Sequence, residues 1–170
     1  MRLFWIVLLA SLATLVIYYF YPEPGLPADT EIDKLVVLKG ERIMHAYSNG
    51  SVIRTYKISL GKNSVGHKQA EGDYRTPEGD YFINSRNDES GYHRNLGISY
   101  PNKADRDAAM KSNVSPGGDI KIHGLRNGLG FIGKFQRWND WTAGCIAITD
   151  AEVDELADRV RLGTPITILP

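Results

Sequence analysis

The chain has 170 residues, of which 20 are basic and 20 are acidic, so its formal net charge at pH 7 is zero. This balance excludes the overall positive field typical of a nucleic-acid-binding protein, and the length is sufficient for one compact domain with a substantial core. Seventeen glycines and eight prolines indicate many turns, which favours a mainly β architecture.

The N-terminal 21 residues form a nearly continuous hydrophobic segment. Leu3 to Tyr21 is apolar except at Ser11 and Thr14, and Arg2 precedes it. A helix of this length measures about 28 Å at about 1.5 Å per residue, close to the thickness of a bilayer core. We therefore expect residues 1–21 to be an uncleaved, single-pass signal anchor in the inner (cytoplasmic) membrane, with the following domain in the periplasm. The alternative is a signal peptide that is cleaved after export.

Tyrosines at the far end of this segment indicate a membrane interface. Tyr18, Tyr19 and Tyr21 occupy the position where an aromatic belt is expected in a membrane-spanning helix. Residues 22–33 follow, and their prolines predict a stiff, extended linker. Residues 34–170 are then the predicted folded domain.

Short hydrophobic runs alternate with turn residues in this domain, a pattern typical of β-strands. Asn49-Gly50 predicts a tight hairpin, because these residues tolerate a positive φ at both central positions of the turn. The predicted strands are 35–38, 42–47, 52–60, 80–84, 119–123, 145–148 and 165–169.

Two helices are predicted between these strands. Residues 104–111 are expected to form a short helix, and Thr149 with Glu152 fits a capping box that begins a second one. Apolar residues in 153–160 recur at helical spacing, so this helix should pack one face on the core. Residues 61–76 and 125–140 are predicted to be loops.

Cys145 is the only cysteine in the chain, so it has no partner for an internal disulfide. Gly144 before it allows the backbone to approach a substrate carbonyl, and His123 upstream is a candidate acceptor for the thiol proton. The alternative is a buried cysteine that acts only as a small hydrophobic side chain.

Two motifs contain these residues: His123-Gly124, and Thr142-Ala143-Gly144-Cys145. They resemble the signature of the YkuD-type L,D-transpeptidase catalytic domain, in which His-Gly is followed by Ser/Thr-x-Gly-Cys. Thr76-Pro77-Glu78-Gly79 is similar to another motif of that family, and the resemblance covers residues 34–170. It implies a mainly β fold, a sandwich or barrel with one or two short helices.

The resemblance also implies an activity. A cysteine acyl-transferase of this family acts on peptidoglycan stem peptides: Cys145 would attack the diaminopimelate–D-Ala bond, release D-Ala and pass the acyl group to an amine. An amine of a second stem gives a 3-3 cross-link, and a lipoprotein amine is another acceptor. Water as acceptor would make the chain an L,D-carboxypeptidase or amide hydrolase. A non-catalytic wall-binding module is the alternative from a different class.

Catalytic roles are expected for a few residues only. His123 would be the general base, the Gly124 carbonyl would orient its imidazole, and the N–H groups of Gly144 and Cys145 would bind the oxyanion. No cofactor is implied, and no metal site is expected, because the chain has no closely spaced ligand pair. The candidate substrate-binding residues are His93, Tyr100, Trp141, Thr142 and Arg126, with Trp138 as a further candidate for the cleft wall.

Two positions depart from the family pattern. Ala143 stands where relatives often have a second histidine, and Ala147 stands where they often have an arginine. Both differences leave the choice of acceptor open between an amine and water.

Overall fold

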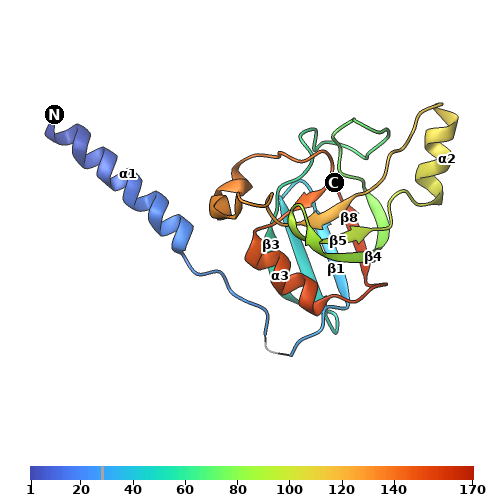
Figure 1. Cartoon of the computed structure of the whole chain (residues 1–170), viewed down its shortest axis with the longest axis horizontal. Coiled ribbons are helices and arrows are strands. Elements are labelled where there is room, and N and C mark those ends of the chain that lie inside the picture. Colours follow the sequence, from blue (N-terminus) through green and yellow to red (C-terminus); the bar gives the residue numbers. More distant parts are fainter. Residues whose placement is uncertain (28) are drawn as a thin grey trace.

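The structure is a computed structural model that describes residues 1–27 and 29–170. Helix α1 (Arg2–Phe20) projects from a β domain as a separate rod (Figure 1). It has a mean hydropathy of 2.3 and none of its residues is buried, so by length and composition it is able to cross a membrane. The predicted linker 22–33 includes residue 28, which lies outside the described residues.

Eight strands form one strongly curled sheet. Its order is β3-β2-β1-β8-β4-β5-β6-β7, with β1–β8 and β6–β7 parallel and the other pairs antiparallel. The strands are β1 (Lys34–Leu38), β2 (Ile43–Ser48), β3 (Ser51–Lys57), β4 (Gly79–Ser90), β5 (His93–Ile98), β6 (Lys121–His123), β7 (Ile146–Ala147) and β8 (Pro165–Leu169).

The two ends of this sheet meet. Beyond β3, the Ser59 N–H donates to the Ala147 carbonyl at 2.9 Å, and the Ala147 N–H donates back to Ser59 at 2.8 Å. This bridge joins the chain after β3 to β7, so the sheet closes on itself around its apolar side chains. The expected mainly β sandwich or barrel with few helices is therefore confirmed.

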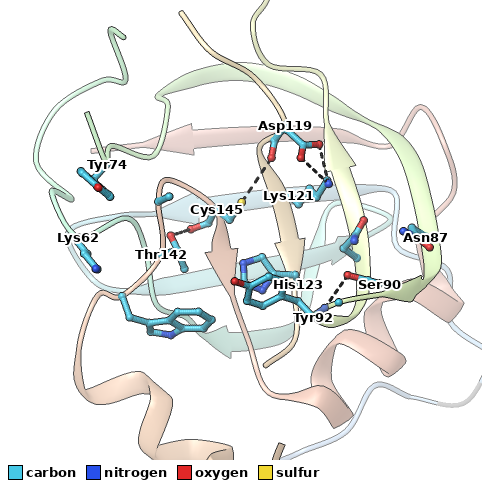
Figure 2. Close-up of a pocket in the computed structure, with 14 residues that line it drawn as sticks. Lys62, Tyr74, Asn87, Ser90, Tyr92, Asp119, Lys121, His123, Thr142 and Cys145 are labelled. Atoms are coloured by element: carbon cyan, nitrogen blue, oxygen red, sulfur yellow. Dashed lines mark hydrogen bonds and ion pairs between the residues drawn. The ribbon is translucent and has the colours of Figure 1, made fainter. Parts of the chain in front are cut away.

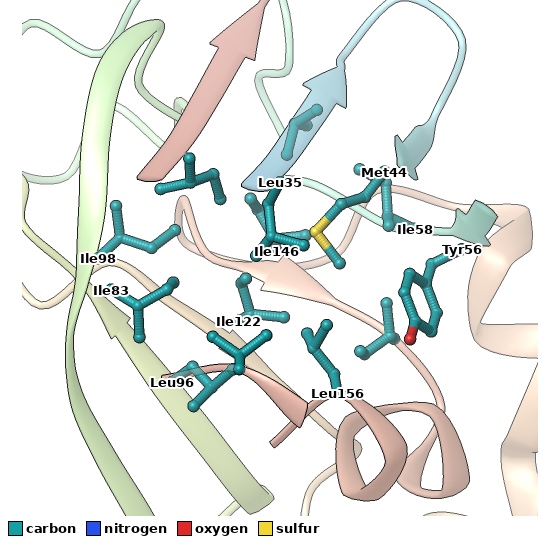
Figure 3. Close-up of a cluster of buried hydrophobic side chains, with 14 of the residues drawn as sticks. Leu35, Met44, Tyr56, Ile58, Ile83, Leu96, Ile98, Ile122, Ile146 and Leu156 are labelled. Atoms are coloured by element: carbon teal, nitrogen blue, oxygen red, sulfur yellow. The ribbon is translucent and has the colours of Figure 1, made fainter. Parts of the chain in front are cut away.

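The core lies inside the curled sheet, and α3 (Asp150–Arg159) covers one side of it (Figure 3). Ile122 of β6 and Ile146 of β7 are fully buried in this core. Because successive strand residues point to opposite faces, the neighbours of these two isoleucines are directed to the other face of the sheet. That second face carries the candidate site.

Local sequence signals account for several boundaries. Asn49 and Gly50 have φ values of 50° and 77°, as the predicted hairpin requires. Helix α3 begins with the predicted capping box: the Glu152 N–H donates to Thr149 Oγ1, and the Thr149 N–H donates to the Glu152 carboxylate. Helix α2 (Lys103–Lys111) begins one residue before the predicted start, and Asn102 is its N-cap.

Other boundaries differ from the prediction. Strand β4 has 12 residues and continues to Ser90, because it pairs first with β8 and then with β5, a strand that the sequence pattern did not indicate. Strand β3 ends at Lys57, since the following residues leave the hairpin to close the sheet. The predicted loop 125–140 contains a 3-10 segment, η1 (Gly130–Trp138), which is kinked at Gly133.

Candidate active site

A cleft of about 500 Å³ opens where β6 and β7 lie together (Figure 2). Four residues predicted from the sequence line it: His123, Trp141, Thr142 and Cys145. In the parallel β6–β7 pair, Ile122 lies opposite Ile146 and His123 lies opposite Ala147. Cys145, directly before β7, therefore shares the cleft face of the sheet with His123.

The turn that presents Cys145 is fixed by Thr142. Its hydroxyl donates to the Cys145 carbonyl at 2.7 Å and accepts from the Gly144 N–H at 3.1 Å. Gly144 has a φ of 133°, and a Cβ at this position would lie 2.7 Å from the Arg75 carbonyl oxygen, so only glycine fits. In the free protein, the Gly144 N–H is thus already engaged by Thr142.

The imidazole of His123 is held in one orientation. Its Nδ1 lies 2.6 Å from the Gly124 carbonyl oxygen, so Nδ1 carries the proton that is donated and Nε2 is the nitrogen that can accept one. The ring of Tyr92 lies 4.8 Å and that of Trp141 5.6 Å from the imidazole, between centroids. The Trp141 indole N–H in turn donates to Gln136 at 3.0 Å.

Burial shapes the protonation of both reactive groups. It raises the pKa of the Cys145 thiol above its usual range, although the Lys121 backbone N–H opposes this. It lowers the pKa of His123, although the hydrogen bond to Gly124 opposes this. Both shifts favour a neutral thiol and a neutral imidazole in the cleft of the free protein, rather than a thiolate and an imidazolium.

Three of the candidate substrate-binding residues lie outside the lining of the cleft. His93 is directed toward α3, with its Nε2 2.9 Å from the Asp154 carboxylate. Tyr100 is buried and its hydroxyl donates to the Pro116 carbonyl at 2.9 Å. Arg126 is exposed in the loop after β6. Trp138, the further candidate, packs on α1, 6.0 Å from the Tyr18 ring.

The sequence reasoning missed other residues that line the cleft. Tyr92 lines it in place of its neighbour His93, and Lys62 and Tyr74 come from the predicted loop 61–76. Lys121 forms an ion pair with Asp119 at 2.7 Å. The position of Lys121, two residues before His123 on one strand, was a signal for its place on the cleft face.

The loop 61–76 is held by a buried lysine. Lys39 is 2% exposed, and its ammonium donates to the carbonyls of Gly66 and Thr76 at 2.7 and 2.9 Å. It also pairs with Glu78 at 2.8 Å. These contacts tie both halves of the loop to the sheet, so the wall formed by Tyr74 is fixed.

A carboxylate organises the same loop from inside. Asp73 accepts the backbone N–H groups of Gln69, Ala70 and Arg75 and pairs with Lys68 at 2.7 Å. Although burial opposes it, the hydrogen bonds from Lys68 and the backbone lower the pKa of Asp73 to about 2.

We expect Asp73→Asn to lower the free energy of unfolding at pH 7 by about 1.5–3 kcal/mol, because the charged acceptor of three backbone N–H groups and of the buried Lys68 ammonium is lost. A carboxyl with a depressed folded-state pKa stabilises above its unfolded pKa, so the difference from wild type should shrink as the pH falls from about 4 toward 2. Urea denaturation at several pH values measures this. Asp107→Asn, which removes an exposed ion pair with Lys103, is the control and should change little. Equal stability of Asp73→Asn and wild type at pH 7 would contradict the prediction.

No group of three or more His, Cys, Asp or Glu side chains within residues 1–27 and 29–170 is arranged to hold a metal ion. The ionisable and aromatic groups that line the cleft include a thiol, an imidazole, two ammonium groups, the Asp119 carboxylate and the rings of Tyr74, Tyr92 and Trp141.

Comparisons with known proteins give the same family as the motifs. Residues 33–168 match the family model of the YkuD L,D-transpeptidase catalytic domain. The "Putative L,D-transpeptidase YafK" of Escherichia coli K12 is 27% identical over 126 residues, which cover 71% of this chain and 44% of that protein. The chain thus spans less than half the length of this curated relative.

Solved structures share the fold. The helical cell shape determining protein Pgp2 from Campylobacter jejuni superposes with a TM-score of 0.60 at 24% identity, covering 82% of this chain and 48% of that one. An L,D-transpeptidase from Xylanimonas cellulosilytica gives a TM-score of 0.53 at 16% identity, covering 86% and 65%. With the family model matched over nearly the whole β domain, and with its two motifs brought together in one cleft, this chain belongs to the YkuD family of L,D-transpeptidase catalytic domains.

Proposed function

We propose that this chain is a membrane-anchored L,D-transpeptidase, a cysteine acyl-transferase that acts on peptidoglycan stem peptides in the periplasm. The observation that carries the proposal is one cleft lined both by the Cys145 thiol and by a His123 imidazole whose Nδ1 is tied to the Gly124 carbonyl. A binding module needs neither the thiol nor a histidine with an oriented Nε2.

The proposed reaction begins from neutral groups. As Cys145 Sγ attacks the carbonyl carbon of the diaminopimelate–D-Ala bond, His123 Nε2 accepts the thiol proton. The Cys145 N–H donates to the developing oxyanion, and the Gly144 N–H can add a second hydrogen bond only by leaving Thr142. His123 then returns the proton to the leaving amine, the C–N bond breaks, and D-Ala departs from a thioester on Cys145.

The second half transfers the acyl group. An acceptor amine attacks the thioester carbonyl and gives its proton to His123, and the C–S bond breaks to restore the Cys145 thiol. The same steps with water release a free tripeptide stem. His123 thus alternates between base and acid in each half-reaction.

Lysines take the place of the absent family arginine in this proposal. Lys62 and Lys121 line the cleft on different sides of Cys145 (Figure 2). Each is a candidate partner for a carboxylate of a stem peptide, and Tyr92 and Trp141 offer apolar faces beside them. Lys62 also lies 5.7 Å from the centre of the Tyr74 ring, which limits its position.

The proposal also concerns which molecule accepts the acyl group from Cys145. Ala143 lines the cleft without a polar group for an incoming amine, and Ala147 is buried outside the lining, so we infer that water competes with the second stem peptide. We expect the full-length chain, incubated with a disaccharide-tetrapeptide, to form more free tripeptide than 3-3 dimer, since D-Ala is released on both routes. A mass-spectrometric time course measures both products.

The products of that time course distinguish transpeptidation from hydrolysis and test the substrate assignment. Dimer as the main product throughout would mean plain transpeptidation and would end the hydrolase alternative. If neither product appears with a folded protein, the substrate assignment is wrong.

The cellular position follows from α1. We propose that residues 1–21 remain as a single-pass anchor in the inner membrane, that 22–33 connect it to the domain, and that 34–170 act in the periplasm. The apolar length of α1 and its preceding positive charge support this. A part in determining cell shape, the property in the name of the Campylobacter relative, fits an enzyme that edits stem peptides at this location.

A further inference from the structure

Exposed apolar side chains gather on η1 and on the segment just before it. Phe131 is 73% exposed, Trp138 is 57% exposed, and Leu129 is also exposed. We call these three residues the η1 apolar face. Single exposed apolar residues are ordinary on protein surfaces, but two large aromatic rings and a leucine in one short segment indicate an interaction surface.

The end of α1 packs directly against η1. The Tyr19 ring lies 5.4 Å from that of Phe135, and its hydroxyl donates to the Phe131 carbonyl at 2.8 Å. Tyr18 lies 6.0 Å from Trp138, between ring centroids. In Figure 1 the orange coil of η1 is the part of the domain that faces the end of α1.

Gly133 makes this contact possible. It has a φ of 49°, and a Cβ there would lie 2.9 Å from Cε2 of the Tyr19 ring. Glycine thus permits both the kink of η1 and the approach of Tyr19.

Polar contacts extend the attachment into the linker. Glu23 pairs with Arg137 at 2.8 Å and with Lys134 at 3.3 Å. Arg137 is nearly buried and also pairs with Glu152 of α3 at 2.7 Å. The helix end, the linker and η1 are therefore joined to the body of the domain by oriented contacts.

This attachment sets the position of η1 along the membrane normal. Tyr18 and Tyr19 lie in the last turn of a 19-residue helix. A helix of that length spans about 28 Å, so its last turn lies at the membrane surface when α1 crosses the bilayer. A segment in contact with that turn lies at the same level, where aromatic side chains are favoured.

We propose that the η1 apolar face inserts into the interface of the same membrane that holds α1, so that the catalytic domain is docked on the lipid surface. This inference rests on the proposed anchoring by α1. It assigns Leu129, Phe131 and Trp138 to a lipid partner.

Docking at η1 would orient the catalytic cleft. Gln136 is buried in η1, where it accepts the Trp141 indole N–H, and its own carbonyl accepts the Ser59 hydroxyl at 2.7 Å. Trp141 contacts the His123 ring in the cleft. Only a few side chains thus separate the lipid-facing surface from the catalytic imidazole, and the cleft is held close to the membrane.

The test uses the full-length chain with Trp5→Phe, reconstituted in phosphatidylethanolamine–phosphatidylglycerol vesicles whose acyl chains carry bromine near the headgroups. We expect a loss of Trp138 emission relative to vesicles without bromine. Trp138→Phe in the same background measures the signal of Trp141, which is subtracted. Gly133→Ala, which forces Tyr19 away from η1, should reduce the quenching, whereas Met110→Ser, at a 69% exposed apolar residue of α2, should not.

Alkaline extraction of the same vesicles separates the two levels of the proposal. A chain that resists extraction but shows equal Trp138 emission with and without bromine would overturn the docking and leave the anchor in place. A chain that is released by extraction would overturn both.

Discussion

Replacing Cys145 with serine should abolish acyl transfer and leave the fold intact. Serine keeps the shape of the side chain, but its hydroxyl is far less acidic than the thiol and is a much weaker nucleophile for a neutral imidazole to activate. We expect a loss of about 10⁴–10⁶-fold in kcat, the range found when a nucleophile is removed from an acyl-transfer site.

The assay follows D-Ala release and the mass of the protein during turnover. Wild type should accumulate an acyl-enzyme adduct and Cys145→Ser should not, while thermal unfolding of the two proteins should coincide. Wild-type turnover in a folded Cys145→Ser protein would remove Cys145 from the mechanism.

Replacing His123 with alanine should lower kcat/KM by about 10²–10⁴, the usual contribution of a positioned general base. The pH profile is the sharper readout. Burial lowers the pKa of His123, so the imidazole stays neutral, and able to accept a proton, at pH values where an ordinary histidine is already charged. Wild-type activity should therefore persist below pH about 6.5 and fall only as the pH passes through the lowered pKa.

The control for this profile is His93→Gln. His93 pairs with Asp154 on α3, outside the cleft lining, so its replacement should leave the acid limb where it is in wild type. If His93→Gln loses the acid limb of the pH–activity profile, or if His123→Ala keeps it, a group other than His123 is responsible for that limb.

The rate of thiol labelling at Cys145 should differ from that of a cysteine activated by a lowered pKa. Because burial raises the pKa of Cys145, its alkylation in the free protein should be slow at neutral pH and should accelerate only in the alkaline range. Slow labelling is thus compatible with catalysis, since the proton leaves the thiol during attack on the substrate.

Motifs that act over a few residues were predictable from the sequence. The Asn49-Gly50 turn and the α3 capping box are set by local backbone and side-chain preferences. The shared cleft of His123 and Cys145 was predictable from the resemblance to the family signature, and the short β6–β7 pair places both residues on one face of the sheet.

Other parts of the site depend on contacts between distant segments. Lys62 and Tyr74 reach the cleft because Lys39 and Asp73 fold the loop 61–76, an arrangement without a local pattern. The sequence predicts a substrate-binding role for His93, whereas its neighbour Tyr92 is the residue that lines the cleft. His93 has a φ of 62° at the β4–β5 turn, so neighbouring side chains go to different sides. In strands, a shift of one position exchanges the two faces.

The junction of Ser59 with Ala147 bears on when the proposed active site is assembled during folding. Ala147 lies two positions after Cys145, and its partner Ser59 comes 88 residues earlier in the chain. Pairings between such distant segments carry a large loop-closure cost and form slowly compared with local hairpins. In an unfolded chain Cys145 is therefore not yet in the cleft, and the proposed acyl-transfer activity should appear only when these last strands have paired.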